Sequence, residues 1–160
     1  MTATPTEKRG TFLVTDADAD SAVLSDVADG QVHTLTSNPG LTEDDIVEGV
    51  LVAEPPLEVM WSLTDIEHRR QLQIVVPDEP PAERTVDLAA GEGVGELVKQ
   101  PLEGTTEGEL HVLSVAPEKT EAAIDDITED DATRIRAARL GASRVEVRGA
   151  DGVIGVRYLR

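Results

Sequence analysis

Cysteine is absent from this chain, and aromatic residues are nearly so: Phe12, Trp61 and Tyr158 are the full set. The lack of cysteine excludes disulfides, thiolate metal sites and a cysteine nucleophile. The lack of aromatics means that the core must be built from Val, Leu, Ile and Ala. No apolar run approaches the ~20 residues of a membrane-spanning helix, and residues 1–9 lack the apolar segment of a signal peptide. We therefore expect a cytoplasmic protein.

Positive charge is scarce as well, and lysine most of all. The 160 residues hold 32 Asp and Glu against 14 Lys and Arg, of which only three are Lys, and the net charge is −18. Such a charge density makes a compact chain repel itself, whereas at 1 M salt the Debye length is only about 3 Å. We interpret the composition as that of a halophilic protein that requires high KCl for stability. Disorder is the main alternative, and a hydrophobic content of 39% in regular patterns argues against it.

Short strands dominate the first half of the chain. Residues 1–10 are polar and predict a flexible tail. Residues 11–76 read as five or six short antiparallel strands separated by turn residues. Among them, residues 57–66 alternate apolar and polar side chains, and residues 72–76 form the last strand. The order of these strands predicts a small antiparallel β-barrel of the OB-like type.

The clearest hairpin of this half lies within residues 22–36. Its turn is predicted at Asp29-Gly30, a dipeptide typical of two-residue type I′ turns because both positions need positive φ. This turn places Leu24 opposite Leu35, so that apolar side chains meet across the pair.

The second half begins after a proline-rich segment. Three prolines in five positions mark residues 77–85 as a linker between two domains. Residues 86–160 predict an α+β domain, an α-β-α-β-β sandwich with its helices on one face of a small sheet. Its first helix is expected over residues 86–98. A second helical segment starts at Pro117, restarts after Thr128 and ends at Gly141.

The last element is predicted in most detail. Asp151-Gly152 turns a hairpin whose register pairs Val147 with Val156 on one face. The same register pairs Glu146 with Arg157 on the other face. One register therefore yields both an apolar face and an opposite-charge pair.

A calcium-like pattern occurs at residues 16–20, where Asp and Ala alternate. An EF-hand loop needs Gly at its sixth position and Glu at its twelfth. This chain has Ser21 and Val27 there. The pattern therefore favours a solvated acidic loop over a dedicated cation site.

Other motifs of catalysis and cofactor binding are also incomplete. His33, His68 and His111 show none of the usual spacings of a zinc site. Residues 91–95 hold three glycines but are followed by Glu96, where a dinucleotide-binding loop needs Gly. Carboxylates are too abundant for any pair to stand out as acid and base. We therefore predict no catalytic residue, no metal and no cofactor.

Charge reverses near the end of the chain. Residues 134–160 hold seven Arg and two acidic residues, a net charge of +5 against −23 for the rest. Arg144 and Arg148 alternate with Glu146 on the outward face of the last hairpin, beside Arg157. These three arginines form the predicted docking face. An acidic protein surface fits it better than phosphate, because salt weakens phosphate binding steeply and few aromatics can stack bases.

Six segments spread along nearly the whole chain have a familiar sequence: residues 11–15, 29–35, 37–40, 110–113, 137–141 and 156–159. Through these segments the chain resembles an uncharacterised haloarchaeal protein family of unknown function. The resemblance implies a halophilic habitat. It implies no activity, cofactor or catalytic residue.

Three hypotheses about function follow. The first is a non-enzymatic interaction or adaptor protein of the cytoplasm, which docks a protein partner or a second copy of itself through Arg144, Arg148 and Arg157. The second is an RNA-binding protein that uses the OB-like barrel and the same arginines. The third and least favoured is an enzyme with a carboxylate or histidine site.

Overall fold

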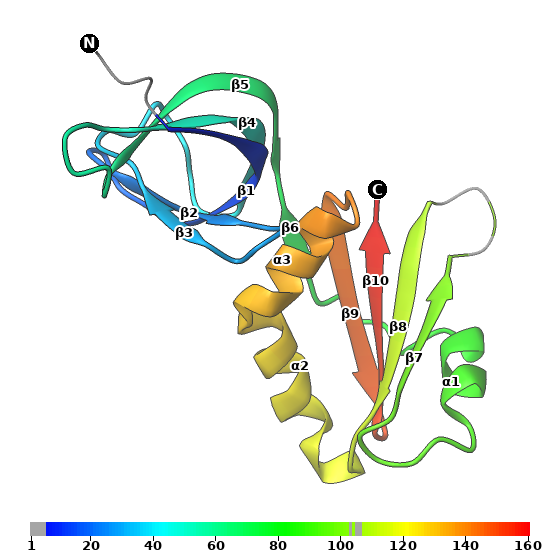
Figure 1. Ribbon diagram of the computed structural model, residues 1–160. Coiled ribbons are helices and arrows are strands. Elements are labelled where there is room, and N and C mark those ends of the chain that lie inside the picture. The colour runs from blue at the N-terminus through cyan, green and yellow to red at the C-terminus, as the bar shows by residue number, and fades with distance from the viewer. Residues whose placement is uncertain (1–5, 103, 105–106) are drawn as a thin grey trace. The chain divides into compact units, whose positions relative to one another are not determined.

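The computed structural model describes residues 6–102, 104 and 107–160, and it is a mixed α+β protein, as the sequence predicts. The chain divides into two compact units. Unit 1 comprises Met1–Leu72 and Arg134–Arg139, and unit 2 comprises Gln73–Thr133 and Leu140–Arg160. Within the described residues, each unit is built on a five-stranded sheet (Figure 1).

Unit 1 contains an antiparallel sheet with the strand order β3-β2-β1-β4-β5. The strands are β1 (Glu7–Ala17), β2 (Ala22–Asp26), β3 (Val32–Thr34), β4 (Asp45–Ala53) and β5 (Trp61–Gln71). One further contact lies outside these ladders: Leu35, just after β3, forms a parallel bridge with Trp61 at the start of β5. There the backbone N–H of Thr36 donates to the carbonyl oxygen of Trp61 at 2.9 Å.

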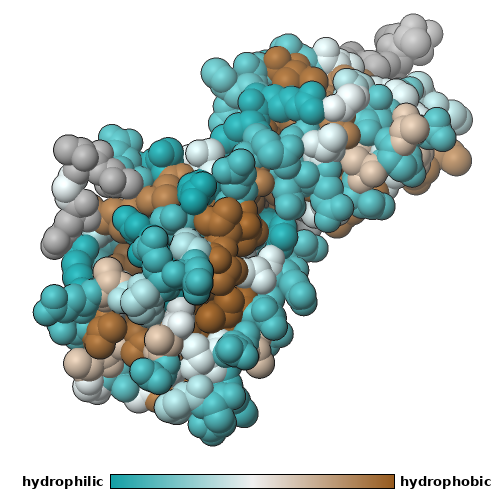
Figure 2. Space-filling model, turned by 180° about the vertical axis from the view of Figure 1, so that it is seen from behind, coloured by the Kyte–Doolittle hydropathy of each residue, from teal (hydrophilic) through white to brown (hydrophobic). Residues whose placement is uncertain are grey.

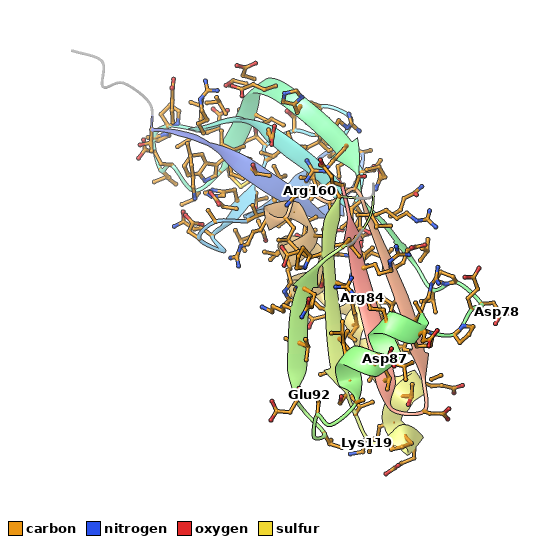
Figure 3. The ribbon with its side chains drawn as sticks, turned by 90° about the vertical axis from the view of Figure 1, so that its right-hand side faces the viewer. Asp78, Arg84, Asp87, Glu92, Lys119 and Arg160 are labelled. Atoms are coloured by element: carbon orange, nitrogen blue, oxygen red, sulfur yellow. The ribbon has the colours of Figure 1, made fainter. Side chains whose placement is uncertain are left out.

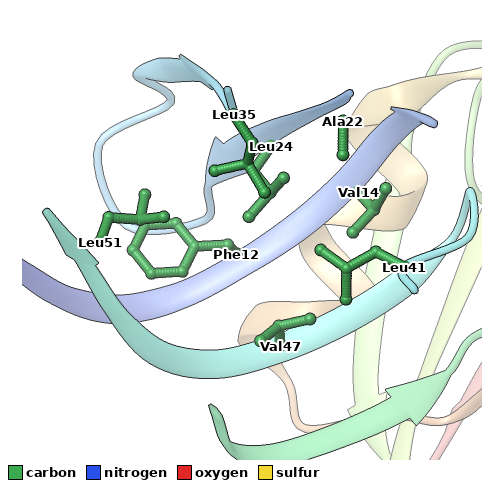
Figure 4. Close-up of a cluster of buried hydrophobic side chains, with 8 residues drawn as sticks. All are labelled: Phe12, Val14, Ala22, Leu24, Leu35, Leu41, Val47 and Leu51. Carbon is green, nitrogen blue, oxygen red and sulfur yellow. The ribbon is translucent and has the colours of Figure 1, made fainter. Parts of the chain in front are cut away.

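The core of unit 1 is aliphatic except for one phenylalanine ring, as the composition requires. Figure 4 shows its buried cluster: Phe12, Val14, Ala22, Leu24, Leu35, Leu41, Val47 and Leu51. Trp61 and Leu63 of β5 pack against this cluster from the side. Burial of apolar surface, at roughly 25 cal/mol per Å², is therefore the main term that holds this sheet in its curved form.

The ends of the predicted first domain differ in the structure. β1 begins at Glu7, which pairs with Val52 of β4, so residues 7–10 belong to a strand and not to the predicted tail. At the other end, β6 (Gln73–Val75) does not complete the first sheet. It pairs in parallel with a strand of unit 2. Both ends of the first domain are set by pairing with strands distant in sequence, β4 for residues 7–10 and β9 for β6. The local sequence does not reveal this pairing.

The strand predicted over residues 57–66 starts later than expected. Leu57 and Val59 are exposed, and Glu58 has a φ of 56°, which breaks the extended conformation. β5 therefore begins only at Trp61.

The predicted hairpin within residues 22–36 exists, but its register differs by two residues. Leu24 pairs with His33 and not with Leu35. The cause is the carboxylate of Asp26, which accepts hydrogen bonds from the backbone N–H groups of Ala28 at 2.7 Å and Asp29 at 3.3 Å. This capping produces a longer loop, in which only Gly30 has positive φ. A shift of two preserves the faces of the strand, and Leu24 and Leu35 both remain buried.

Unit 2 contains the strand order β6-β9-β10-β8-β7. Its other strands are β7 (Leu97–Pro101), β8 (Gly108–Ser114), β9 (Arg144–Ala150) and β10 (Val153–Leu159). Its helices are α1 (Glu83–Ala89), the 3₁₀ turn η1 (Pro117–Lys119), α2 (Thr120–Glu129) and the start of α3 (Asp131–Arg139). The β6–β9 pair is parallel and the remaining pairs are antiparallel.

Helices cover both faces of this second sheet, whereas the sequence predicted helices on one face only. Two glycines show this. Gly155 of β10 lies against α1, since a Cβ there would be 2.8 Å from Thr85 Cγ2. Gly149 of β9 lies against α2, since a Cβ there would be 2.7 Å from Ile124 Cδ1. Gly149 pairs with Ile154, the neighbour of Gly155, so the two glycines face opposite sides of the sheet.

The helix predicted over residues 86–98 is wrong in extent. α1 ends at Ala89, and Gly91 and Gly95 adopt φ values of 86° and 90° in the turn that leads to β7. The proline-rich segment, predicted as a linker between domains, joins β6 to α1 within unit 2.

The last hairpin is confirmed. Val147 pairs with Val156, and Glu146 pairs with Arg157. Asp151 and Gly152 have φ values of 50° and 84°, as a type I′ turn requires.

A candidate arginine pocket

The seven arginines of residues 134–160 are divided between the two units. Arg134 belongs to unit 1 and donates to the carboxylate of Asp44 at 2.8 Å. Arg139, also in unit 1, donates to the carbonyl oxygen of Val27. These two side chains fix helix α3 within unit 1. The predicted docking residues are different, because they lie on β9 and β10 of unit 2.

Those three residues, Arg144, Arg148 and Arg157, converge on one carboxylate. Glu146 is only 8% exposed. Its oxygens lie 3.2 Å from Arg157 Nη1, 3.4 Å from Arg144 Nη2 and 3.9 Å from Arg148 Nη2. Strand geometry explains the cluster: residues two apart on β9 share a face, and Arg157 is the cross-strand partner of Glu146.

The sequence predicted that this face of the hairpin points outward, and the structure shows otherwise. It is the face that carries α1, and the helix supplies a fourth arginine, Arg84. Figure 3 views this side of the sheet and labels Arg84. Arg84 Nη2 lies 3.4 Å from Gln100 Oε1 of β7.

A pocket of about 200 Å³ opens between α1 and the strands, and we call it the arginine pocket. Three guanidinium-bearing residues line it, together with small and apolar ones: Pro81, Ala82, Arg84, Thr85, Leu102, Leu110, Arg148, Gly155 and Arg157. Arg144 is not among them. Gly155 leaves room for the close approach of Thr85, and Leu110 reaches the pocket because its cross-strand partner on β10 is Arg157.

Arg148 is more enclosed than Arg157, the other pocket arginine that pairs with a glutamate. Its side chain is 19% exposed, and its Nη1 lies 3.1 Å from the carboxylate of Glu79, which is 64% exposed. Within the described part of the chain, the buried Nε of Arg148 has no hydrogen-bond partner. The pocket therefore combines positive charge with an apolar lining.

A family model of unknown function, DUF5812, matches residues 8–149. The chain belongs to this family. The match includes Arg84, Arg144 and Arg148 and ends before Arg157. No curated protein and no solved structure matches the chain. DUF5812 membership brings no activity with it, so the arguments about function rest on the geometry.

The three histidines of this DUF5812 protein have different surroundings. His33 lies in the core of unit 1 and His68 is exposed on β5. His111, on β8 of unit 2, lies beside Tyr158, and its Nε2 is 3.3 Å from Glu109 Oε1. None of them lines the arginine pocket. A search of the described residues for three or more His, Asp or Glu side chains placed to hold a metal finds none.

His33 has the most unusual environment of the three. It is 2% exposed and meets the rings of Phe12 and Trp61 edge-on, with centroid distances of 6.0 and 4.6 Å. Its Nε2 lies 3.1 Å from Lys8 Nζ. Burial, and then the positive charge of Lys8, lower the pKa of His33 below its usual value.

Lys8 itself is held by acids. Burial alone would lower its pKa, but hydrogen bonds from Lys8 to Asp29 and Asp26 and their charges raise the pKa of Lys8 above its usual value. Lys8 Nζ lies 2.8 Å from Asp29 and 3.1 Å from Asp26. The cluster fastens β1 to the β2–β3 loop, which is a structural role.

The remaining sequence candidates have local structural explanations. In the acidic loop of residues 16–20, the Asp18 carboxylate accepts hydrogen bonds from the backbone N–H groups of Asp20 and Ser21, both at 2.8 Å. Asp18 thus stabilises the turn between β1 and β2. Among the described residues, no helix is both long and apolar enough to cross a membrane.

Proposed function

We propose that this DUF5812 protein is a non-enzymatic interaction protein of a salt-rich cytoplasm, and that it docks an acidic partner in the arginine pocket. The observation that carries the proposal is the gathering of Arg84, Arg148 and Arg157 around one pocket, in a chain whose net charge is −18. In such a chain, a local cluster of guanidinium groups is the surface that attracts acidic groups.

Salt argues for a pocket over an open surface. At molar ionic strength exposed charges interact only over about 3 Å, whereas partly buried pairs are screened much less. Arg148 is mostly enclosed, and Arg157 is a third exposed. Arg144 is more exposed and lies outside the pocket. We therefore assign docking to Arg84, Arg148 and Arg157, and no longer include Arg144.

The strand order of unit 1 supports the OB-like barrel as its finer fold. Continued through the parallel bridge between Leu35 and Trp61, the neighbours run β1-β2-β3-β5-β4 and back to β1. A five-stranded, partly open Greek-key barrel is the OB architecture. Binding of RNA there is not favoured, because Phe12 is buried in the core and Trp61 packs against it, which leaves no aromatic platform for bases.

Affinity capture from the native host tests the docking proposal. The full chain is used as bait in molar KCl, with and without nuclease, beside an Arg84→Gln/Arg157→Gln variant. We expect an acidic protein that is captured by the wild type, lost with the double variant and indifferent to nuclease.

Lys99→Gln/Lys119→Gln provides a matched control, since it also removes two positive charges from unit 2 but lies outside the pocket. Circular dichroism in the same buffer establishes that the variants are folded. Equal capture by the double variant would contradict the proposal. Nucleic acid that disappears with nuclease would support the RNA hypothesis instead.

A further inference from the structure

The size of the arginine pocket limits what can occupy it. A volume of about 200 Å³ equals roughly seven waters at about 30 Å³ each. Pockets for drug-sized ligands and cofactors span about 300–1,000 Å³. The enclosed part of the pocket therefore holds a group of about the size of one amino-acid residue.

The charges in and around the pocket limit the occupant further. Arg84, Arg148 and Arg157 line it, Glu146 contacts two of these arginines, and Glu79 contacts Arg148 from the exposed side. Arg144 also pairs with Glu146, at 3.4 Å, so three arginines share this one carboxylate. An anionic group that enters the pocket therefore meets a surplus of positive charge.

Arg148 contributes a guanidinium whose two terminal nitrogens approach carboxylates, Nη1 at Glu79 and Nη2 at Glu146. Its Nε is buried and, among the described residues, lacks an acceptor, so this side chain is held by the terminal nitrogens alone. An anionic oxygen in the pocket gains charge-assisted hydrogen bonds from the guanidinium groups that line it.

The apolar lining indicates what lies next to the anionic group. Pro81, Ala82, Leu102 and Leu110 contribute hydrocarbon to the same small space. A free phosphate has no hydrocarbon to place against this part of the lining. A carboxylate whose neighbour is an aliphatic side chain satisfies both parts of the lining.

We infer that the arginine pocket binds the C-terminal residue of a partner chain, with an aliphatic last side chain against Leu102 and Leu110 and the terminal carboxylate on Arg84, Arg148 and Arg157. A chain end joins a carboxylate and an aliphatic side chain at one Cα, which fits a residue-sized pocket. Capture of a terminal carboxylate is an established mode of peptide recognition. This inference rests on the proposed docking function and specifies its ligand.

Isothermal titration calorimetry of the full chain in molar KCl tests the inference. One peptide ends in Ala-Leu with a free carboxylate, and a second is identical but amidated at its end. A third is amidated and carries an internal Glu. The free acid is expected to bind at least tenfold more tightly than either amide.

Variants separate the two parts of the lining. Arg84→Gln is expected to weaken the free-acid peptide about tenfold, and Leu102→Asn is expected to weaken it without removing a charge. Lys119→Gln keeps wild-type affinity. Far-UV circular dichroism shows that each variant is folded under the same conditions.

The outcomes distinguish this inference from the docking function on which it rests. Equal binding of the acid and its amide overturns the inference, as does unchanged affinity in Arg84→Gln. Tight binding of the Glu peptide overturns the chain-end ligand but leaves acidic docking in the pocket intact. If no peptide binds but partner capture still depends on Arg84 and Arg157, the chain-end ligand is likewise overturned and acidic docking in the pocket stands.

Discussion

His33 is the residue whose surroundings differ most from those of an exposed strand histidine. It is enclosed by Phe12 and Trp61, and Lys8 Nζ approaches its Nε2. Within the described residues its buried Nδ1 has no hydrogen-bond partner. The ring is therefore held in its neutral form by burial and by a neighbouring cation.

This environment predicts a pH dependence of stability. Because the folded-state pKa of His33 is lowered, the unfolded chain takes up a proton at about pH 6.5, where the folded chain does not. The contribution of neutral His33 to the free energy of unfolding is thus fully present above about pH 6.5, and it is lost as the pH falls toward the folded-state pKa. Thermal melts between about pH 7.5 and pH 5.5 in molar KCl measure it.

His33→Leu is expected to reduce this loss, because it removes the titrating group while keeping the site apolar. His68→Gln, which removes an exposed histidine, is the control and should retain the wild-type profile. If His33→Leu has the same pH profile as the wild type, the role assigned to burial of His33 is wrong.

Among the secondary-structure elements, β1 and β4 meet at two glycines that pair with each other, Gly10 and Gly49. Their surroundings differ. A Cβ at Gly49 would lie 2.1 Å from the backbone oxygen of Asp65 on β5, whereas a Cβ at Gly10 would lie 3.4 Å from its nearest neighbours. The β4–β5 register shifts next to Gly49, so the strands approach closely there.

This difference gives a matched pair of substitutions. Gly49→Ala is expected to destabilise the protein by at least about 1–3 kcal/mol, the usual cost of overpacking, because backbone must move. Gly10→Ala should be neutral or slightly stabilising, since Ala loses less entropy than Gly in a strand. Urea unfolding of both variants in the same buffer measures the difference, and similar midpoints would contradict it.

Elements are predictable from sequence where local and cross-strand signals agree. The last hairpin was predicted in full because its turn and its paired side chains require the same register. The hairpin of β2 and β3 was mispredicted because the Asp26 carboxylate, which carries no register signal, caps its loop. The helix predicted over residues 86–98 is too long because Gly91 and Gly95 adopt positive φ, which a helix does not allow.

The candidate site was predictable to the same degree. Arg144, Arg148 and Arg157 were found because alternation on a strand places them on one face with Glu146. Arg84 was missed because the placement of α1 over β8 and β10 depends on contacts distant in sequence, such as Thr85 with Gly155. The burial of that face was missed for the same reason.

For the whole molecule, charge is the dominant property. The net charge is −18, and Figure 2 shows hydrophilic residues over most of the face that it draws. Many of these acids lie within a Debye length of one another in dilute buffer, and their repulsion opposes folding.

Stability is therefore expected to rise with KCl. Between low salt and molar KCl, the thermal midpoint should increase by more than about 4 °C, the shift that roughly 1 kcal/mol produces in small domains. Circular dichroism melts across a KCl series measure it. A series in sucrose, which favours burial without screening charge, is the control. A midpoint independent of KCl would contradict the halophilic interpretation.

The most direct test of the account is to observe the arginine side chains themselves. In ¹⁵N-labelled protein in molar KCl, each Arg Nε–H is followed while the free-acid peptide is added. We predict saturable shifts for Arg84, Arg148 and Arg157, while Arg9 of β1 stays unchanged. Unchanged pocket arginines, or equal shifts at all arginines, would show that the arginine pocket does not bind the carboxylate of a chain end.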